Sequence, residues 1–162
     1  MGRTRSQAGK LAHRKGGAFE RLIAAKFNEA GVTATRAWWQ SLARGTKVPD
    51  VQVDGLWLEL HHGATPPLEK LEQAEAYVNR LWGVRNAGAP VPVAVTRKTG
   101  AKGIQALLRA SGWASLLGLP RPPRTIADIP LSMDLRDFLT VIRLRQDLAR
   151  QVQSTLEAGP ET

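Results

Sequence analysis

Two carboxylates, Asp50 and Glu59, stand on either side of an apolar stretch that contains the dipeptide Asp54-Gly55. An Asp-Gly pair between two alternating apolar runs predicts a β-hairpin with a two-residue loop. Counting back from that loop sets Asp50 opposite Glu59, with Cβ atoms about 4.5–5.5 Å apart, where like charges destabilise a sheet. A divalent cation would offset this repulsion, since Mg²⁺ binds one or two carboxylates and keeps positions for water and phosphate oxygens. The spacing therefore indicates a metal site, but acids on the solvated face of a hairpin would give the same pattern.

The predicted hairpin has two different faces, because side chains alternate across a strand. One face is entirely apolar and is expected to belong to the core: Val51, Val53, Leu56, Leu58 and Leu60. The other face collects the polar side chains and one tryptophan: Asp50, Gln52, Trp57, Glu59 and His61. We expect any chemistry on this second face.

The hairpin also carries a recognisable motif. Pro49-Asp50, followed by the tripeptide ELH at residues 59–61, resembles the signature of the PD-(D/E)XK nucleases, with His61 where that superfamily usually has lysine. An upstream helix with Glu20 and the downstream run LEKLEQAEAY, residues 68–77, make the chain similar to the archaeal-type Holliday junction resolvases and their phage-encoded relatives. The similarity extends over residues 10–97, with a weaker likeness in the segment MDLRDFL, residues 133–139.

This resemblance implies an α/β fold with a restriction-endonuclease-like core, in which helices flank a central mixed β-sheet. It implies one or two Mg²⁺ or Mn²⁺ ions, bound by Asp50, Glu59, the main-chain carbonyl of Leu60 and Glu20. The implied activity is metal-dependent resolution of four-way (Holliday) DNA junctions by paired symmetric nicks. Paired cuts imply a homodimer with two active sites, which we expect in the cytoplasm, or in the host cytoplasm if the chain is phage-encoded.

The resemblance also implies roles for other residues. Gln73 is expected to orient the metal-bound water or the phosphate, and Ser41 is expected near the scissile phosphate. Simpler explanations stay open: a solvated helix face for Gln73, and for Glu20 an ordinary first-turn glutamate favoured by the helix dipole.

The histidine at position 61 leaves three readings open. His61 acts as a proton carrier or a weaker stabiliser, or the site borrows Lys47 or another lysine, or the substitution has abolished cleavage while junction binding persists. Two alternative functions follow: a nuclease for other branched DNA, and a structure-selective DNA-binding protein without catalysis.

Charge is unevenly distributed along the chain, whose formal net charge is +9. Residues 1–47 hold ten Lys and Arg against two acids, residues 48–90 hold three against six, and residues 91–125 hold six against none. An acidic centre between basic segments is expected where phosphates approach carboxylates that hold metal, although solubility or an anionic membrane also explains basic segments. We expect DNA contacts from the following cations: Arg14, Lys15, Arg36, Arg44, Lys47, Arg97, Lys98 and Lys102.

Composition excludes several other classes of protein. The chain has no cysteine, which excludes a disulfide framework, a cysteine nucleophile and the usual structural zinc sites. It also has no apolar run of membrane-spanning length, so a membrane partner is not expected.

The elements that must position these residues follow from apolar spacing and turn residues. Residues 1–16 are expected to form a flexible basic arm, residues 17–157 one domain and residues 158–162 a frayed tail. We expect helices over residues 17–30, 65–83 and 104–117, and a last helix capped by Asp134. Besides the hairpin, we expect strands over residues 32–39, 90–97 and 126–133, the last being an edge strand interrupted by Pro130.

Overall fold

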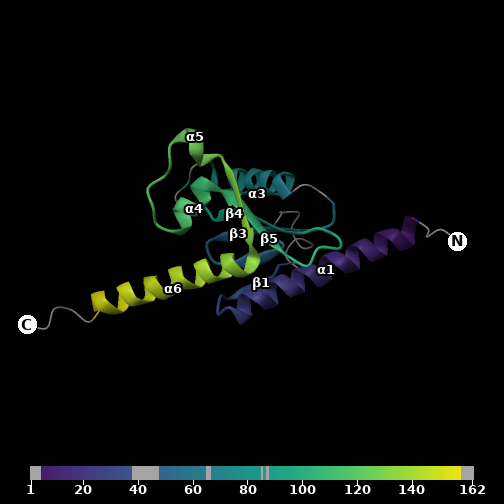
Figure 1. Ribbon diagram of the computed structural model, residues 1–162, viewed down its shortest axis with the longest axis horizontal. Helices are drawn as coiled ribbons and strands as arrows, with labels where there is room; N and C mark the ends of the chain where they lie inside the picture. Colours follow the sequence, from purple (N-terminus) through teal and green to yellow (C-terminus); the bar gives the residue numbers. More distant parts are fainter. Residues whose placement is uncertain (1–4, 38–47, 65–66, 85, 87, 158–162) are drawn as a thin grey trace, which may run out of the picture.

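A six-stranded mixed sheet forms the centre of the molecule, and helices cover both of its faces (Figure 1). The computed structural model describes residues 5–37, 48–64, 67–84, 86 and 88–157, with side chains described from Lys15 onward. In sheet order the strands are β1 (Ala34–Arg36), β2 (Val51–Val53), β3 (Leu56–His62), β4 (Val91–Arg97), β5 (Gln105–Arg109) and β6 (Pro130–Asp134). Strands β3 and β4 run parallel, and the other neighbouring strands pair antiparallel. The expected α/β class, with a mixed sheet flanked by helices, is confirmed.

The hairpin of β2 and β3 has the predicted register. The paired residues are Val53 with Leu56, Gln52 with Trp57, and Val51 with Leu58. Gly55 closes the loop with a φ of 71°, in the left-handed region that glycine adopts without a steric penalty. The loop and the pairing could therefore be read from the Asp-Gly dipeptide and the alternation around it.

Helix α3 (Pro67–Trp82) connects β3 to β4. Two neighbouring parallel strands need such a crossover, because the chain must return to the end of the sheet at which the first strand began. It covers one face of the sheet, where its buried residues Leu71, Ala74 and Val78 belong to two small apolar clusters with strand residues Trp57, Ala94 and Leu107. Both the predicted helix over residues 65–83 and the predicted strand over residues 90–97 are confirmed.

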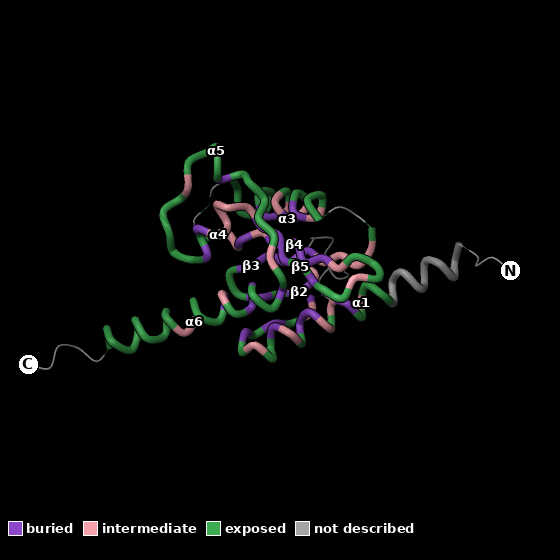
Figure 2. The backbone as a smooth tube through the Cα atoms, viewed as in Figure 1, coloured by how far each residue is buried: buried purple, intermediate pink, exposed green. Residues whose placement is uncertain are grey.

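The main core lies on the opposite face of the sheet, beneath α1 (Arg5–Glu29) and α6 (Leu135–Glu157). Phe27 of α1 and Phe138 of α6 meet edge to face, with ring centroids 6.4 Å apart. The two helices extend past the sheet in opposite directions (Figure 1), and every residue of α6 from Leu148 onward is exposed (Figure 2). Asp134 caps α6 as predicted, since its Oδ1 accepts a hydrogen bond of 2.9 Å from the main-chain N–H of Arg136.

The prediction of one helix over residues 104–117 is wrong in its first half. Residues 105–109 form β5, and a short helix, α4 (Ala110–Leu116), follows directly. In β5, Ala106 and Leu108 face the main core while Leu107 faces α3. A strand buried on both faces has a continuous apolar run, which hydrophobic periodicity cannot distinguish from a buried helix.

Several element boundaries also differ from the prediction. Helix α1 begins at Arg5 instead of Gly17, so residues 5–16 of the predicted arm are helical, while the flexibility of the arm stays a prediction. The edge strand β6 begins at Pro130, the first position of a strand, where a missing N–H is tolerated. The four-residue helix α5 (Arg124–Ala127), just before β6, was not predicted.

Among the described helices, none has the length and apolar character needed to cross a membrane.

Candidate active site

Asp50 lies just before β2, at the point where pairing with β3 ends. Its main-chain N–H donates a hydrogen bond of 3.0 Å to the carbonyl of Leu58, and its side-chain Oδ2 accepts one of 2.8 Å from the N–H of Leu60. The carboxylate thus takes the place that a main-chain carbonyl would occupy if the antiparallel ladder continued. This bond joins the Asp50 carboxylate to the main chain of β3 at Leu60, while the direct pairing of Asp50 with Glu59 stays a prediction because the ladder ends at Val51 and Leu58.

Glu59 is buried, with 2% of its surface exposed, on the face of β3 that α3 covers. Its Oε1 accepts a hydrogen bond of 3.1 Å from Nε1 of Trp57, which is itself 2% exposed and packs against Ala74 and Val78 of α3. Burying a carboxylate is costly unless it is hydrogen-bonded or paired, and the indole supplies one such bond. The alternative of a solvated hairpin face is therefore wrong for Glu59.

Glu20, the predicted third metal ligand, forms an ion pair with Arg36, a predicted DNA contact. Nε and Nη2 of Arg36 both donate to Oε2 of Glu20, at 3.0 and 2.5 Å, and the pair joins α1 to β1. Within the described residues, no three or more Asp, Glu or His side chains gather in a group that could hold a metal ion. In this arrangement Glu20 neutralises Arg36, and the predicted roles of both residues stay predictions.

His61 lies beside the first turns of α3, close to Lys70 and Glu69. Burial lowers the pKa of His61 below its ordinary 6.5, and the positive charges of Lys70 and His62 lower it further, against an opposing effect of Glu69. The imidazole therefore carries less positive charge near neutral pH than an ordinary histidine side chain. This is the opposite of what a substitute for a permanently charged lysine needs.

Lys70 supplies a permanent charge at this position. Its Nζ donates a hydrogen bond of 2.8 Å to Oε1 of Gln73, the residue predicted to orient water or phosphate. Lys70 and Gln73 are both partly buried and stand three residues apart on α3, so they share a helix face. Lys70 was not among the predicted site residues, although its spacing from Gln73 was a usable signal.

Two neighbours limit how the histidine side chains can move. A Cβ added at Gly63 would lie 2.7 Å from Nε2 of His61, so the imidazole lies directly over this glycine. His62 points to the other side of β3, where its ring packs against Phe19 of α1 with a centroid distance of 5.6 Å. His62 therefore lies on the opposite side of the strand from His61 and packs against α1.

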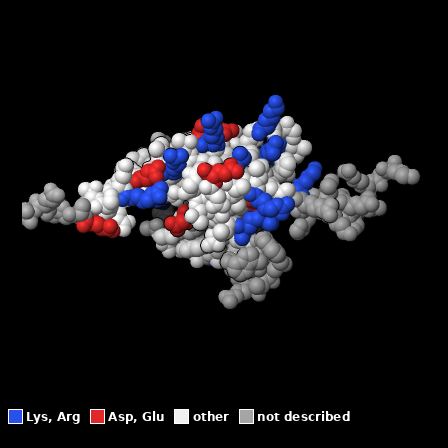
Figure 3. Space-filling view, turned by 90° about the horizontal axis from the view of Figure 1, so that it is seen from below, with Lys and Arg blue, Asp and Glu red and all other residues white. Residues whose placement is uncertain are grey.

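The predicted DNA contacts are distributed over several elements. Lys15, Lys98 and Lys102 are exposed, whereas Arg97 is half-buried and its Nε donates to the carbonyl of Ala101 at 3.1 Å. On the face shown in Figure 3, Lys and Arg side chains alternate with acidic ones and do not form one continuous basic surface. The remaining predicted residues lie outside the described side chains: Arg14, Ser41, Arg44 and Lys47.

Comparison with known proteins gives no match. No family model matches the chain, and neither a curated protein nor a solved structure is similar to it. We therefore infer function from the residues and their geometry.

Proposed function

We propose that this chain is a structure-selective, metal-dependent endodeoxyribonuclease that resolves four-way DNA junctions by paired symmetric nicks. The observation that supports the proposal is the hydrogen bond from the Leu60 N–H to Oδ2 of Asp50, which joins this carboxylate to the main chain of β3 next to Glu59 in sequence. The mixed sheet, with an antiparallel hairpin before the crossover helix and helices on both faces, fits the architecture that the sequence resemblance implies.

The residues at this position fit a hard divalent cation. Asp50, Glu59 and the main-chain carbonyl of Leu60 would hold Mg²⁺ or Mn²⁺, and two carboxylates suffice for an ion that keeps several water or phosphate ligands. When bound, the ion would polarise the scissile phosphate and lower the pKa of a bound water. The Trp57 indole restrains the Glu59 carboxylate, and the Leu60 N–H restrains that of Asp50.

Lys70 is a candidate for the positive charge that the motif usually has at the position of His61. Of the three readings, the geometry favours the one in which the site borrows another lysine, because the Lys70 ammonium lies near His61 and is bonded to Gln73. A lysine there would stabilise negative charge on the phosphate, while neutral His61 could accept a proton. The basic segments would bind the DNA phosphates. Two copies of the chain would act together, since paired nicks need two active sites.

A second candidate is a junction-binding protein with weakened cleavage. Two observations favour it: Glu20 is engaged by Arg36, and the pKa of His61 is lowered, which reduces the positive charge of its ring near neutral pH. Both would reduce the charge stabilisation available at the site, while the exposed Lys15, Lys98 and Lys102 would still be available to bind DNA phosphates.

The test compares cleavage with binding on three substrates under one salt condition: a labelled four-way junction, a replication fork and a linear duplex. We expect Mg²⁺-dependent nicking of the junction that is at least about 100-fold slower in Asp50→Asn and in Glu59→Gln, with junction binding in EDTA unchanged. The matched control is Asp54→Asn, which alters an exposed acid in the turn of the same hairpin and keeps a turn-forming residue.

Each contrary result has a defined meaning. Full cleavage by Asp50→Asn, or no Mg²⁺ dependence, would overturn the nuclease proposal. Tight junction binding without cleavage, with a large gain in His61→Lys, would establish the second candidate. Equal cutting of fork and junction would assign the enzyme to other branched DNA.

A further inference from the structure

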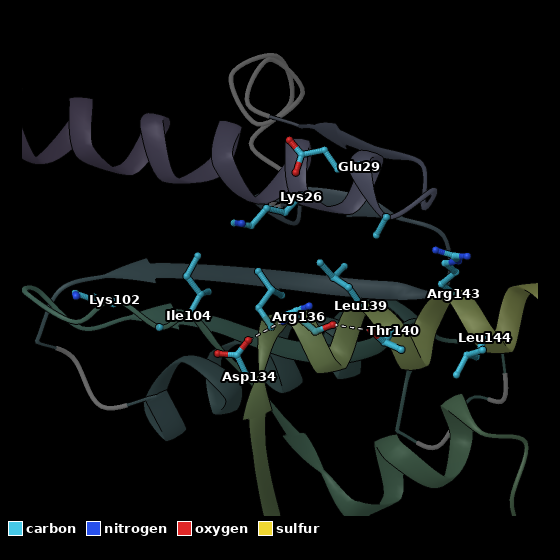
Figure 4. A pocket seen from close by; sticks show the side chains of 13 residues that line it. Lys26, Glu29, Lys102, Ile104, Asp134, Arg136, Leu139, Thr140, Arg143 and Leu144 are labelled. Atoms are coloured by element: carbon cyan, nitrogen blue, oxygen red, sulfur yellow. Dashed lines mark hydrogen bonds between the residues drawn. The ribbon is translucent and has the colours of Figure 1, made fainter.

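A groove of about 640 Å³ separates the C-terminal end of α1 from the first turns of α6 (Figure 4). Apolar side chains from three parts of the chain line it: Ala30 after α1, Ile104 before β5, and Leu135, Leu139 and Leu144 of α6. It lies on the sheet face that α1 and α6 cover, opposite the face of Glu59 and α3. We call it the α1–α6 groove.

Four cations surround this apolar lining: Lys26 of α1, Lys102 between β4 and β5, and Arg136 and Arg143 of α6. In the part of the chain that the structure describes, the first three take part in no ion pair, and Arg143 makes a long contact of 3.7 Å with exposed Asp147. The groove also contains two acids, Glu29 and Asp134, but Asp134 is already used to cap α6. The lining therefore has an excess of positive charge.

The apolar surface continues past the groove along α6. Leu144, Leu148 and Val152 follow at four-residue spacing and are 62%, 61% and 53% exposed. Leu144 belongs both to the groove and to this row, which spans about 12 Å of helix. A surface of this length exceeds what a small ligand covers and suits two or three turns of a helix.

We propose that the α1–α6 groove binds an amphipathic helix of a partner protein, with the apolar face of that helix inward and acidic side chains at its margins. Helices bind in grooves through apolar anchors at i, i+3, i+4 and i+7, and the lining provides the complementary apolar surface. Glu and Asp beside those anchors would meet Lys26, Lys102, Arg136 and Arg143, which fixes the charge of the partner.

Two other occupants fit less well. A second copy of this chain would bring the exposed segment of α6, which has three arginines against two acids over residues 143–157 and so lacks the negative charge that the groove cations favour. The acidic helix α3 is already docked on the sheet by its own apolar face. A DNA backbone would satisfy the cations but would leave the apolar lining and the Leu144–Val152 row exposed to water.

The test uses a fluorescent 16-residue synthetic helix with Leu at i, i+3, i+4 and i+7 and Glu at the remaining positions, and a counterpart with Lys in place of Glu. By fluorescence anisotropy we expect the Glu peptide to bind at least about tenfold more tightly than the Lys peptide, with affinity that falls as salt rises. The double variant Lys26→Glu/Arg143→Glu and the single variant Leu144→Ser should each weaken binding about tenfold.

The matched controls are Arg124→Glu and Leu119→Ser, which alter an exposed cation and a 57% exposed leucine outside the groove. Neither should change the affinity by more than about twofold. Circular dichroism of all variants verifies that each remains folded.

Three results would overturn the proposal. The first is absence of Glu-peptide binding, or equal binding in the groove and control variants. The second is a Leu144-dependent dimer in sedimentation without peptide, which would assign the surface to a second copy. The third is a short DNA duplex that displaces the peptide and is itself weakened by Lys26→Glu/Arg143→Glu. None of these readouts depends on nuclease activity, so the test stands apart from that of the proposed function.

Discussion

Nε1 of Trp57 donates a hydrogen bond of 3.1 Å to Oε1 of Glu59, and both residues are 2% exposed. Residues two apart on a strand share a face, so the two side chains are adjacent on β3. The indole stacks on Tyr77 and packs against Ala74 and Val78 of α3. The orientation of a candidate catalytic carboxylate therefore depends on the packing of α3 against the sheet.

The first prediction concerns this bond. Trp57→Phe keeps an aromatic ring but removes the donor, so we expect the free energy of unfolding to fall by about 1–3 kcal/mol, because a buried carboxylate oxygen loses a partner. Urea unfolding measures this change. The control is Trp113→Phe, whose partly buried indole packs edge to face on Phe138 at 5.6 Å and makes no side-chain hydrogen bond within the described residues. Equal losses in the two variants would show that ring size, not the hydrogen bond, determines the change.

The sequence was sufficient to predict the hairpin, because the residues that specify its turn and its pairing are close together in the chain. Asp54-Gly55 specifies the turn, and the alternation around it specifies which residues face the core. The sequence was not sufficient to show that α3 buries the second face, since acids on that face suggested solvent. Trp57 was the contrary signal, because a tryptophan on a strand usually packs against another element.

The candidate site residues also differ in whether the local sequence could predict them. Asp50, Glu59 and His61 were predicted from motif spacing along one hairpin, whereas Lys70 of α3 acts electrostatically on His61 of β3 from another element. The pairing of Glu20 with Arg36 also joins segments sixteen residues apart. Such contacts depend on how a helix is placed on the sheet, which local pattern does not determine.

The second prediction concerns the pH dependence of stability. Burial and Lys70 lower the pKa of folded His61 below 6.5, so between the folded pKa and 6.5 the unfolded chain binds more protons than the folded one. The stabilisation from His61 is therefore complete above pH 6.5 and is lost as the pH falls through the folded pKa. His61→Gln should show a smaller fall in the free energy of unfolding between pH 7.5 and the acidic limit than wild type.

The role of Lys70 in this shift can be measured directly. An NMR titration of the His61 ring should give a higher pKa in Lys70→Met, closer to 6.5, because one nearby positive charge is removed. Lys26→Met, on the opposite face of the sheet, is the control and should leave the pKa of His61 unchanged. An unchanged pKa in Lys70→Met would mean that burial and the charges of His62 and Glu69 set the value without Lys70.

The third prediction uses the close approach of His61 to Gly63. In Gly63→Ala the new Cβ would lie 2.7 Å from Nε2 of His61, so the imidazole must move. Since the clash is with the end of a side chain, we expect a change of less than about 1 kcal/mol in stability. If His61 takes part in cleavage, the junction-nicking rate should fall about tenfold or more. Gly103→Ala is the control, because its Cβ would meet ordinary contacts at 3.7 Å; equal rates in the two variants would argue against a role for the His61 ring.

The fourth prediction concerns the attachment of α3, which carries Lys70 and Gln73, to the sheet. Nε and Nη2 of Arg109 in β5 donate to the two carboxylate oxygens of Glu75 in α3, at 2.8 and 3.0 Å. The hydrogen bond with Glu75 raises the pKa of Arg109 above its ordinary value, so the guanidinium stays charged. Lysine cannot reproduce two parallel bonds, and both side chains are about three-quarters buried.

We therefore expect Arg109→Lys to lower the free energy of unfolding by about 1 kcal/mol and to speed hydrogen exchange of amides in α3. The matched control is Arg143→Lys, because Arg143 makes a single exposed contact of 3.7 Å with Asp147 and such pairs contribute little. Equally fast exchange of α3 amides in both variants would show that the two hydrogen bonds between Arg109 and Glu75 do not determine how firmly α3 is attached to the sheet. Slower junction nicking in Arg109→Lys, with Asp50 and Glu59 untouched, would tie cleavage to the position of α3 and hence to Lys70.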